Sequence, residues 1–388
     1  MKIVVIGSKG LPPRQGGIEH HCAEIYPRIV AQGHQVVLYG RTSYHSSPDR
    51  RPYLYRGVRV IPLPSVPLRG IDALVNSAWA ALLASRQPAD IIHFHALGPS
   101  LFTWIPRLVA PQAQVVVTCH GLDWQRAKWG HLSSQLIRQG ERAAVRFAHV
   151  IGVVSRELQR YLKVTYDRDS VYISNAPASY ATVEGDFDTC ETYGLTPGRY
   201  LVFLGRLVPE KCPDLLIRAF QQLRPEGWML ALVGGTSDTS DYLGGLKQLV
   251  ANDPAIRFTG ELGGEGLAQV VRGAGLFVMP SEVEGLPLAL LEAMQAGVPA
   301  LASDIPVHQE LLGEDRGVLF HVGNVDHCAA ALNWAMHNPA ALQTMATKAQ
   351  DYVQRHHNWE QIAADWHRVY TGLVEQPVLA PAANSRWG

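Results

Sequence analysis

Two glutamates lie at either side of an apolar helix start in the segment SEVEGLPLALLE, residues 281–292. Glu284 follows a short β-rich run, whereas Glu292 lies among leucines in the early helix. A carboxylate in such surroundings needs hydroxyl or amide donors to offset its loss of water. Ribose and sugar hydroxyls are donors of this kind, so the spacing indicates a polyhydroxylated ligand. The alternative interpretation of Glu292 is an ordinary helix acid.

A second charged loop, GRLVPEK, covers residues 205–211 and precedes a helix that Pro213 opens. Arg206 and Lys211 therefore lie at a helix amino end, where two cations and the helix dipole favour an anion. An ordinary solvated pair of cations is the alternative. Gly234, in the turn after the next strand, lets a base or a ribose lie against the backbone.

The first turn of the chain, GSKGLPPRQGGIEHH, is also rich in glycine and precedes a helix. It lacks the G-x-G-x-x-G spacing of dinucleotide-binding dehydrogenases, so the sequence does not favour that class. Gly16 and Gly17 fit either a close approach of backbone to a ligand or a flexible lid loop.

Three histidines follow or lie on apolar strand patterns. His120 comes directly after QVVVTC, and His93 and His95 alternate on one face of DIIHFH. The three could in principle bind a metal, but no carboxylate or cysteine at ligand spacing joins them. The sequence therefore predicts no metal and no other cofactor, and His120 alone would also fit a structural histidine.

The elements that position these residues are short Val/Ile/Leu-rich runs alternating with helical patterns. Continuous apolar strands separated by helices are typical of parallel sheets covered on both faces, so we expect two doubly wound, Rossmann-like α/β domains. Ligands of such sheets bind at the carboxyl ends of the strands, and a cleft between the domains is the expected site. The expected strands are 2–6, 35–39, 58–63, 90–95, 114–119, 150–154, 200–205, 229–235, 256–260, 276–281, 299–303 and 317–320.

The predicted organisation has an amino-terminal Rossmann-like domain at 1–181 and a polar, Gly/Pro-bearing linker at 182–198. A second Rossmann-like domain follows at 199–357. An amphipathic helix at 358–376 is expected to pack back on the first domain, and the tail at 377–388 is expected to be disordered.

Composition excludes several classes. The 388 residues carry a formal net charge of zero, so no global field favours nucleic acid. The five cysteines are scattered without a C-x-x-C pair, which fits a reducing cytoplasm. The apolar start MKIVVI is too short for a signal peptide, and prolines and histidines interrupt the long apolar run after residue 90.

Taken together, the GRLVPEK loop at 205–211, Glu-x7-Glu at 284–292 and AMQAGVP at 293–299 resemble the retaining glycosyltransferases of family four, which have the GT-B fold. The resemblance covers nearly the whole chain. The amino-terminal half, from IGSKGLPPRQGGIEHH to HGLDWQRAKWG, looks like bacterial polysaccharide rhamnosyltransferases and their relatives. The resemblance implies that the protein transfers a sugar from a nucleotide-sugar donor to a glycan or lipid-linked acceptor, without a metal. It also implies that the protein is cytoplasmic and takes part in bacterial surface-polysaccharide synthesis.

The resemblance also implies roles for single residues. Arg206 and Lys211 match the pair that grips the donor diphosphate, and Glu292 matches the ribose-binding acid. Glu284 matches the acid at the transferred sugar, and His120 the histidine beside that sugar. Gly16 and Gly17 match the loop that meets the diphosphate, and Gly285 and Leu286 are assigned to the donor site with Gly234.

One position departs from the family pattern. The usual E-G-F-G is E-G-L-P here, so Pro287 lacks a backbone N–H that often contacts a sugar hydroxyl, which leaves the donor open. We expect acceptor contacts from Asp123, Trp124, Arg126 and Lys128. Arg138, Arg142 and Arg146 recur at four-residue spacing and form either a stripe facing anionic lipid or a solvated helix face.

Other activities share the fold. Sugar-nucleotide epimerases, phosphorylases that need pyridoxal phosphate, and non-catalytic nucleotide-sugar-binding proteins are the alternatives. The arginine–lysine loop and the paired glutamates favour transfer over all three.

Overall fold

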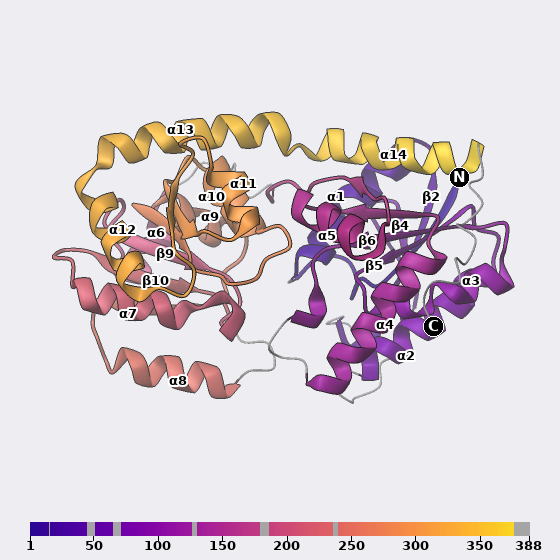
Figure 1. The fold of residues 1–388 in the computed structure, drawn as a ribbon, viewed down its shortest axis with the longest axis horizontal. Coiled ribbons are helices and arrows are strands. Elements are labelled where there is room, and N and C mark those ends of the chain that lie inside the picture. The colour runs from indigo at the N-terminus through magenta and orange to yellow at the C-terminus, as the bar shows by residue number, and fades with distance from the viewer. Residues whose placement is uncertain are drawn as a thin grey trace. The chain divides into compact units, whose positions relative to one another are not determined.

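The computed structural model describes residues 1–14, 16–44, 51–64, 71–125, 130–178, 186–235 and 240–375. The chain divides into two compact units (Figure 1). The first consists of Met1–Asn175 and the carboxyl-terminal segment from Trp359, and the second of Ala176–Asn358.

The first unit contains one sheet with the strand order β3-β4-β2-β1-β5-β6-β7-β8. Its pairs are parallel except for β3 with β4. Buried Val and Ile residues dominate β1, β5 and β6, because helices cover both faces. The elements are β1 (Lys2–Ile6), α1 (Gly17–Ala31), β2 (Gln35–Arg41), β3 (Tyr53–Tyr55), β4 (Val58–Leu63), α2 (Ile71–Ser85), β5 (Ile91–His95), α3 (Trp104–Val109), β6 (Gln114–Cys119), α4 (His131–Phe147), β7 (Val150–Val153), α5 (Arg156–Tyr166), β8 (Val171–Tyr172) and α14 (Trp359–Glu375).

The second unit contains a parallel sheet with the order β11-β10-β9-β12-β13-β14. The expectation of two doubly wound α/β domains is confirmed. The elements are α6 (Asp188–Thr192), β9 (Tyr200–Leu204), α7 (Pro213–Leu223), β10 (Met229–Val233), α8 (Ser240–Val250), β11 (Ile256–Gly260), α9 (Gly264–Arg272), β12 (Leu276–Met279), α10 (Leu288–Gln295), β13 (Ala300–Ser303), α11 (Pro306–Leu312), β14 (Val318–Phe320), α12 (Val325–His337) and α13 (Pro339–His356).

Alternation along the strands divides the second core into two layers. Leu201 and Phe203 of β9 face α7, α8 and α12, whereas Tyr200 and Val202 face α9, α10, α11 and α13. Successive side chains of a strand point to opposite faces, so a wholly apolar strand must be covered twice. Figure 1 shows α7 and α8 on one side of this sheet and α9 to α11 on the other.

The described part of the predicted linker at 182–198 is folded and belongs to the second unit. The described part, from residue 186, contains α6, and Cys190 and Leu195 are buried in the second core. The division between the units falls after Asn175, before the predicted end at 181. Polar and Gly/Pro-bearing sequence predicts a linker, but burial of Cys190 and Leu195 and the packing of α6 against α9 make this segment part of the second unit.

The predicted carboxyl-terminal helix corresponds to α14, which packs against α1 in the first unit. Trp366 and Tyr370 of α14 are fully buried, and both rings contact His93 of β5. The tail at 377–388 lies outside the described residues. Among the described helices, none is both long and apolar enough to cross a membrane.

Candidate active site

The charged loops of the second unit meet where its strand order reverses. The chain runs from β9 outward to β10 and β11, then returns to the other side of β9 as β12. Loops after β9 and β12 therefore diverge from neighbouring carboxyl ends, which is where open α/β sheets bind ligands. Arg206 and Lys211 follow β9, and Glu284 follows β12.

Lys211 and Glu284 form an ion pair across this reversal. Lys211 Nζ donates to Glu284 Oε1 at 2.6 Å, and Ser281 Oγ donates to the same oxygen at 2.7 Å. The side chains are 16% and 10% exposed. Burial alone would raise the pKa of Glu284, but the charge and hydrogen bond of Lys211 outweigh it and lower the pKa. The site therefore presents a fixed carboxylate beside a fixed ammonium group.

Arg206 has its own acidic neighbour. Its Nη2 lies 3.8 Å from Oε1 of Glu210, whose side chain is 7% exposed. Neither carboxylate oxygen of Glu210 accepts a hydrogen bond from the described residues, so the arginine charge is important for its burial. Glu210 lies in the short helix Pro209–Lys211, which ends at Lys211, and Arg206 lies in the loop just before it.

Helix α10 carries the second glutamate of the opening motif. Pro287 is its N-cap residue, and Glu292 is 7% exposed among Leu290, Leu291 and Met294. Gly285 and Leu286 lie in the half-buried turn between Glu284 and the helix. The expected burial of Glu292 is thus present, and its role toward a ribose remains a prediction.

Two of the predicted ligand-binding glycines also have structural reasons to be glycine. Gly16 has φ of 100° at the start of α1, and a Cβ there would lie 2.3 Å from Oε2 of Glu19. Gly234 has φ of 140°, and its Cβ would lie 1.9 Å from the carbonyl oxygen of Gly205. Gly17 is the first residue of α1. Close packing explains Gly16 and Gly234 without a ligand.

His308 of α11 is a site residue that the sequence did not indicate. Its Nδ1 lies 3.1 Å from Ser303 Oγ and 2.9 Å from the Ser303 carbonyl oxygen. Burial lowers its pKa to about 4, and its proximity lowers the pKa of Glu284. The available signal was its place just after PALAS, at the next strand end.

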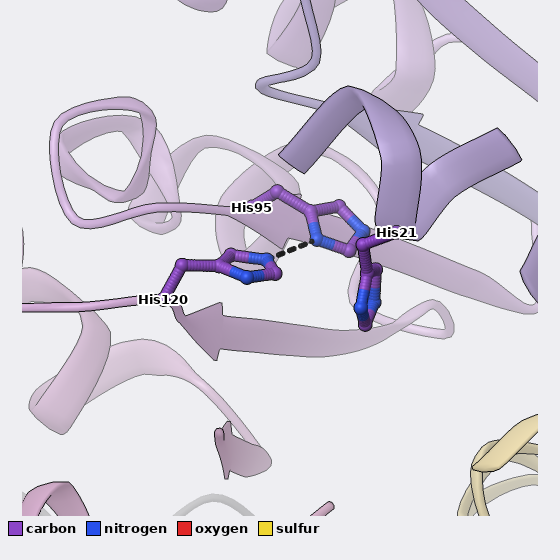
Figure 2. Close-up of side chains that lie close together, drawn as sticks. All are labelled: His21, His95 and His120. Atoms are coloured by element: carbon purple, nitrogen blue, oxygen red, sulfur yellow. Dashed lines mark hydrogen bonds between the residues drawn. The ribbon is translucent and has the colours of Figure 1, made fainter. Parts of the chain in front are cut away.

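The first unit gathers four histidines around one tyrosine. Tyr26 Oη lies 3.1 Å from His93 Nδ1 and 2.6 Å from His95 Nε2. His95 Nδ1 lies 2.9 Å from His120 Nε2, and His21 of α1 completes the group (Figure 2). His93 and His95 stack on one strand face, as the alternation predicted. The sequence missed His21, because the HH pair at 20–21 does not show which ring points inward.

The side chain of Trp124, a predicted acceptor contact, is fixed by residues of α4. Its Nε1 donates to Glu141 Oε2 at 2.9 Å, and the Arg138 guanidinium lies 4.0 Å from the centre of its ring. Tyr161 donates to the other oxygen of Glu141 at 2.8 Å. Asp123 lies in the same short turn, whereas the predicted contacts Arg126 and Lys128 lie outside the described residues.

Two family models match the chain. Glycosyltransferase Family 4 matches residues 15–176, and Glycosyl transferases group 1 matches residues 194–352. The chain is a glycosyltransferase. The enzyme is 27% identical to a GDP-mannose-dependent alpha-(1-6)-phosphatidylinositol monomannoside mannosyltransferase of Mycobacterium tuberculosis, over 94% of this chain and 97% of that relative.

Solved structures share the fold of the glycosyltransferase. Sucrose-phosphate synthase from Thermosynechococcus elongatus superposes with a TM-score of 0.81 at 22% identity, over 96% of this chain and 99% of that one. Anabaena HepE in complex with UDP-glucose gives 0.78 at 19% identity, over 96% and 100%. The fold is therefore GT-B, as the motifs implied.

Proposed function

We propose that the enzyme moves a sugar from a nucleotide-diphosphate sugar to a hydroxyl of a glycan or lipid-linked acceptor, with retained anomeric configuration. The observation that carries this proposal is the arrangement of Arg206, Lys211 and Glu284 around the reversal of strand order. Two cations and a carboxylate there match the charges of a diphosphate and the hydroxyls of a sugar.

In this proposal Arg206 and Lys211 neutralise the charge that grows on the departing diphosphate, without a metal. Glu292 accepts from the ribose, and Glu284 accepts from the transferred sugar. His120 lies beside that sugar, where positive charge develops at the anomeric carbon as in glycoside cleavage. Gly16, Gly17, Gly234, Gly285 and Leu286 offer backbone to the donor.

The proposed setting is bacterial surface-polysaccharide synthesis by an enzyme in the cytoplasm. The mycobacterial relative is named as a GDP-mannose-dependent mannosyltransferase of a phosphatidylinositol monomannoside, and HepE was solved with UDP-glucose. Both names fit a nucleotide-diphosphate sugar as donor, and the mycobacterial name fits a lipid-linked acceptor. The rhamnosyltransferase resemblance of the amino-terminal half adds bacterial polysaccharide assembly to the same proposal.

A thermal-shift screen with UDP, GDP, ADP and dTDP sugars tests donor binding. A donor at about 100 times its dissociation constant stabilises the fold by about 2.7 kcal/mol. We expect one nucleotide to raise the melting temperature, and Glu292→Gln to abolish the rise because an amide cannot pair as a carboxylate does with ribose hydroxyls. Glu265→Gln, which changes an exposed glutamate of α9, is the control. An unchanged shift in Glu292→Gln would remove its ribose role.

Peripheral membrane contact is proposed through the exposed side of α4. Arg138, Arg142 and Arg146 are all exposed there. Removing two interfacial arginines costs about 2 kcal/mol, or about 30-fold in partitioning. Arg142→Glu/Arg146→Glu should therefore lose sedimentation with phosphatidylglycerol vesicles, whereas Arg218→Glu on α7 should keep it. Equal sedimentation of both variants, or none by the wild type at low salt, would exclude this surface.

A further inference from the structure

Three imidazoles of the first unit converge on one point. His21 comes from α1, His95 from the end of β5 and His120 from the residue after β6. One ring nitrogen of each lies within 4.8 Å of the other two. Figure 2 shows the three rings facing one another, and His21 and His95 are almost fully buried. Packing brings these rings together from residues up to 99 positions apart.

The hydrogen bond between His21 and Asn175 assigns the tautomer of His21. Its Nδ1 lies 2.5 Å from Asn175 Oδ1, an acceptor, so Nδ1 carries the proton and donates. Nε2 is then a bare lone pair. It is buried and has no hydrogen-bond partner among the described residues. A buried nitrogen lone pair without a donor is costly, and a metal ion is one group that satisfies it.

The partners of His95 accommodate the tautomer that a metal needs. Its Nε2 lies 2.6 Å from Tyr26 Oη, and both Tyr26 and Tyr370 reach His93 Nδ1. A tyrosine hydroxyl has one proton, so when Tyr26 donates to His93 Nδ1 it accepts from His95 Nε2. The Nδ1 lone pair of His95 then faces His120. Metal-binding histidines are held by outer hydrogen bonds of this kind.

We propose that His21 Nε2, His95 Nδ1 and His120 Nε2 form a binding site for a divalent transition-metal cation, zinc above all. Neutral imidazole suits Zn²⁺, and three histidines leave a fourth position open. On binding, the proton of His120 moves from Nε2 to Nδ1, with no net release.

The site is regulatory and not catalytic. This consequence rests on the proposed function, in which His120 lies beside the transferred sugar. A metal on His120 Nε2 fixes that ring and occupies the space around it, so zinc competes with productive donor binding. Tetrahedral zinc places its nitrogen ligands about 3.4 Å apart, so the three rings must draw together when the ion binds.

Metal binding is measured on the full chain without donor or acceptor, by equilibrium dialysis with Zn²⁺ and by the visible spectrum of Co²⁺. We expect one ion per chain and at least about 100-fold weaker affinity in His21→Ala. Asn175→Leu should weaken binding by about 10- to 100-fold, because it frees the His21 tautomer. The matched control is His321→Ala/His327→Ala, which removes a second histidine pair with rings 4.3 Å apart and should leave binding unchanged.

The outcomes separate this site from the transferase proposal. Absence of a bound ion in the wild type overturns the metal site, as does unaltered affinity in His21→Ala or loss of binding in the control. If His21→Ala fails to fold, His21→Gln replaces it, since its amide can still donate to Asn175. Zinc inhibition of transfer should require at least about 100-fold more zinc in the His21 variant. Binding without any transferase activity would overturn the function and leave the site intact.

Discussion

Arg206→Ala should lower kcat for sugar transfer by about 10²- to 10³-fold, the loss expected when one preorganised donor to developing negative charge is removed. The guanidinium lies 3.8 Å from the buried carboxylate of Glu210, so an opposite charge is already beside it before the donor arrives. Because the charge on the diphosphate grows in the transition state, kcat should fall more than the KM for donor rises. Initial rates against donor concentration measure both.

A conservative variant and a control variant test whether the effect comes from the guanidinium of Arg206. Arg206→Lys keeps the charge but loses the planar fork of donors, so its kcat should fall between those of wild type and Arg206→Ala. Arg218→Ala removes an exposed arginine of α7 and should leave both constants unchanged. A normal kcat in Arg206→Ala, or a change confined to KM, would mean that Arg206 does not act on the leaving group.

Much of the fold was predictable, because a sheet that is covered on both faces needs strands with apolar residues at successive positions. All twelve predicted strands are present, with ends that differ by at most two residues. Within the described residues the strands missed are β3 and β8, which cover three and two residues. Such short edge strands hold no apolar run of their own, since their pairing partners and not their own burial define them.

The site was less predictable, because its contacts join residues that are distant in sequence. Lys211 and Glu284 were assigned to a diphosphate and a sugar separately, yet they are paired across 73 residues. The sequence shows that strand ends carry charges, but not which ends are neighbours. His21 and His308 depend in addition on helix phase, which decides which side of α1 and α11 faces inward.

The pairing itself makes Lys211→Met the variant with the largest expected effect on stability. Removing one partner of a largely buried pair leaves an uncompensated charge, here on Glu284, and costs about 3 kcal/mol at pH 7. Lys211→Met/Glu284→Gln removes both charges, so it should recover most of that stability. Urea unfolding of the four proteins gives the coupling energy, for which we expect about 2–3 kcal/mol.

The pH dependence of the same variants has a definite sign. In the wild type, the lowered pKa of Glu284 stabilises the fold above its ordinary value of 4.5, and this contribution is lost as pH falls through the lowered pKa. In Lys211→Met, burial acts without its cation and raises the pKa. The deficit of that variant against wild type should therefore shrink as pH falls from 7 toward 4.5.

Activity distinguishes the structural role of Lys211 from its proposed chemical role. The double variant should be stable and still lack transfer, because it lacks both the cation proposed to meet the diphosphate beside Arg206 and the carboxylate proposed to meet the sugar. Lys348→Met removes an exposed ion pair with Asp315 in the same unit, so it should change stability by less than about 0.5 kcal/mol and keep activity. A double variant that regains transfer along with stability would show that Lys211 only neutralises Glu284, leaving Arg206 as the sole cation of the proposed leaving-group site.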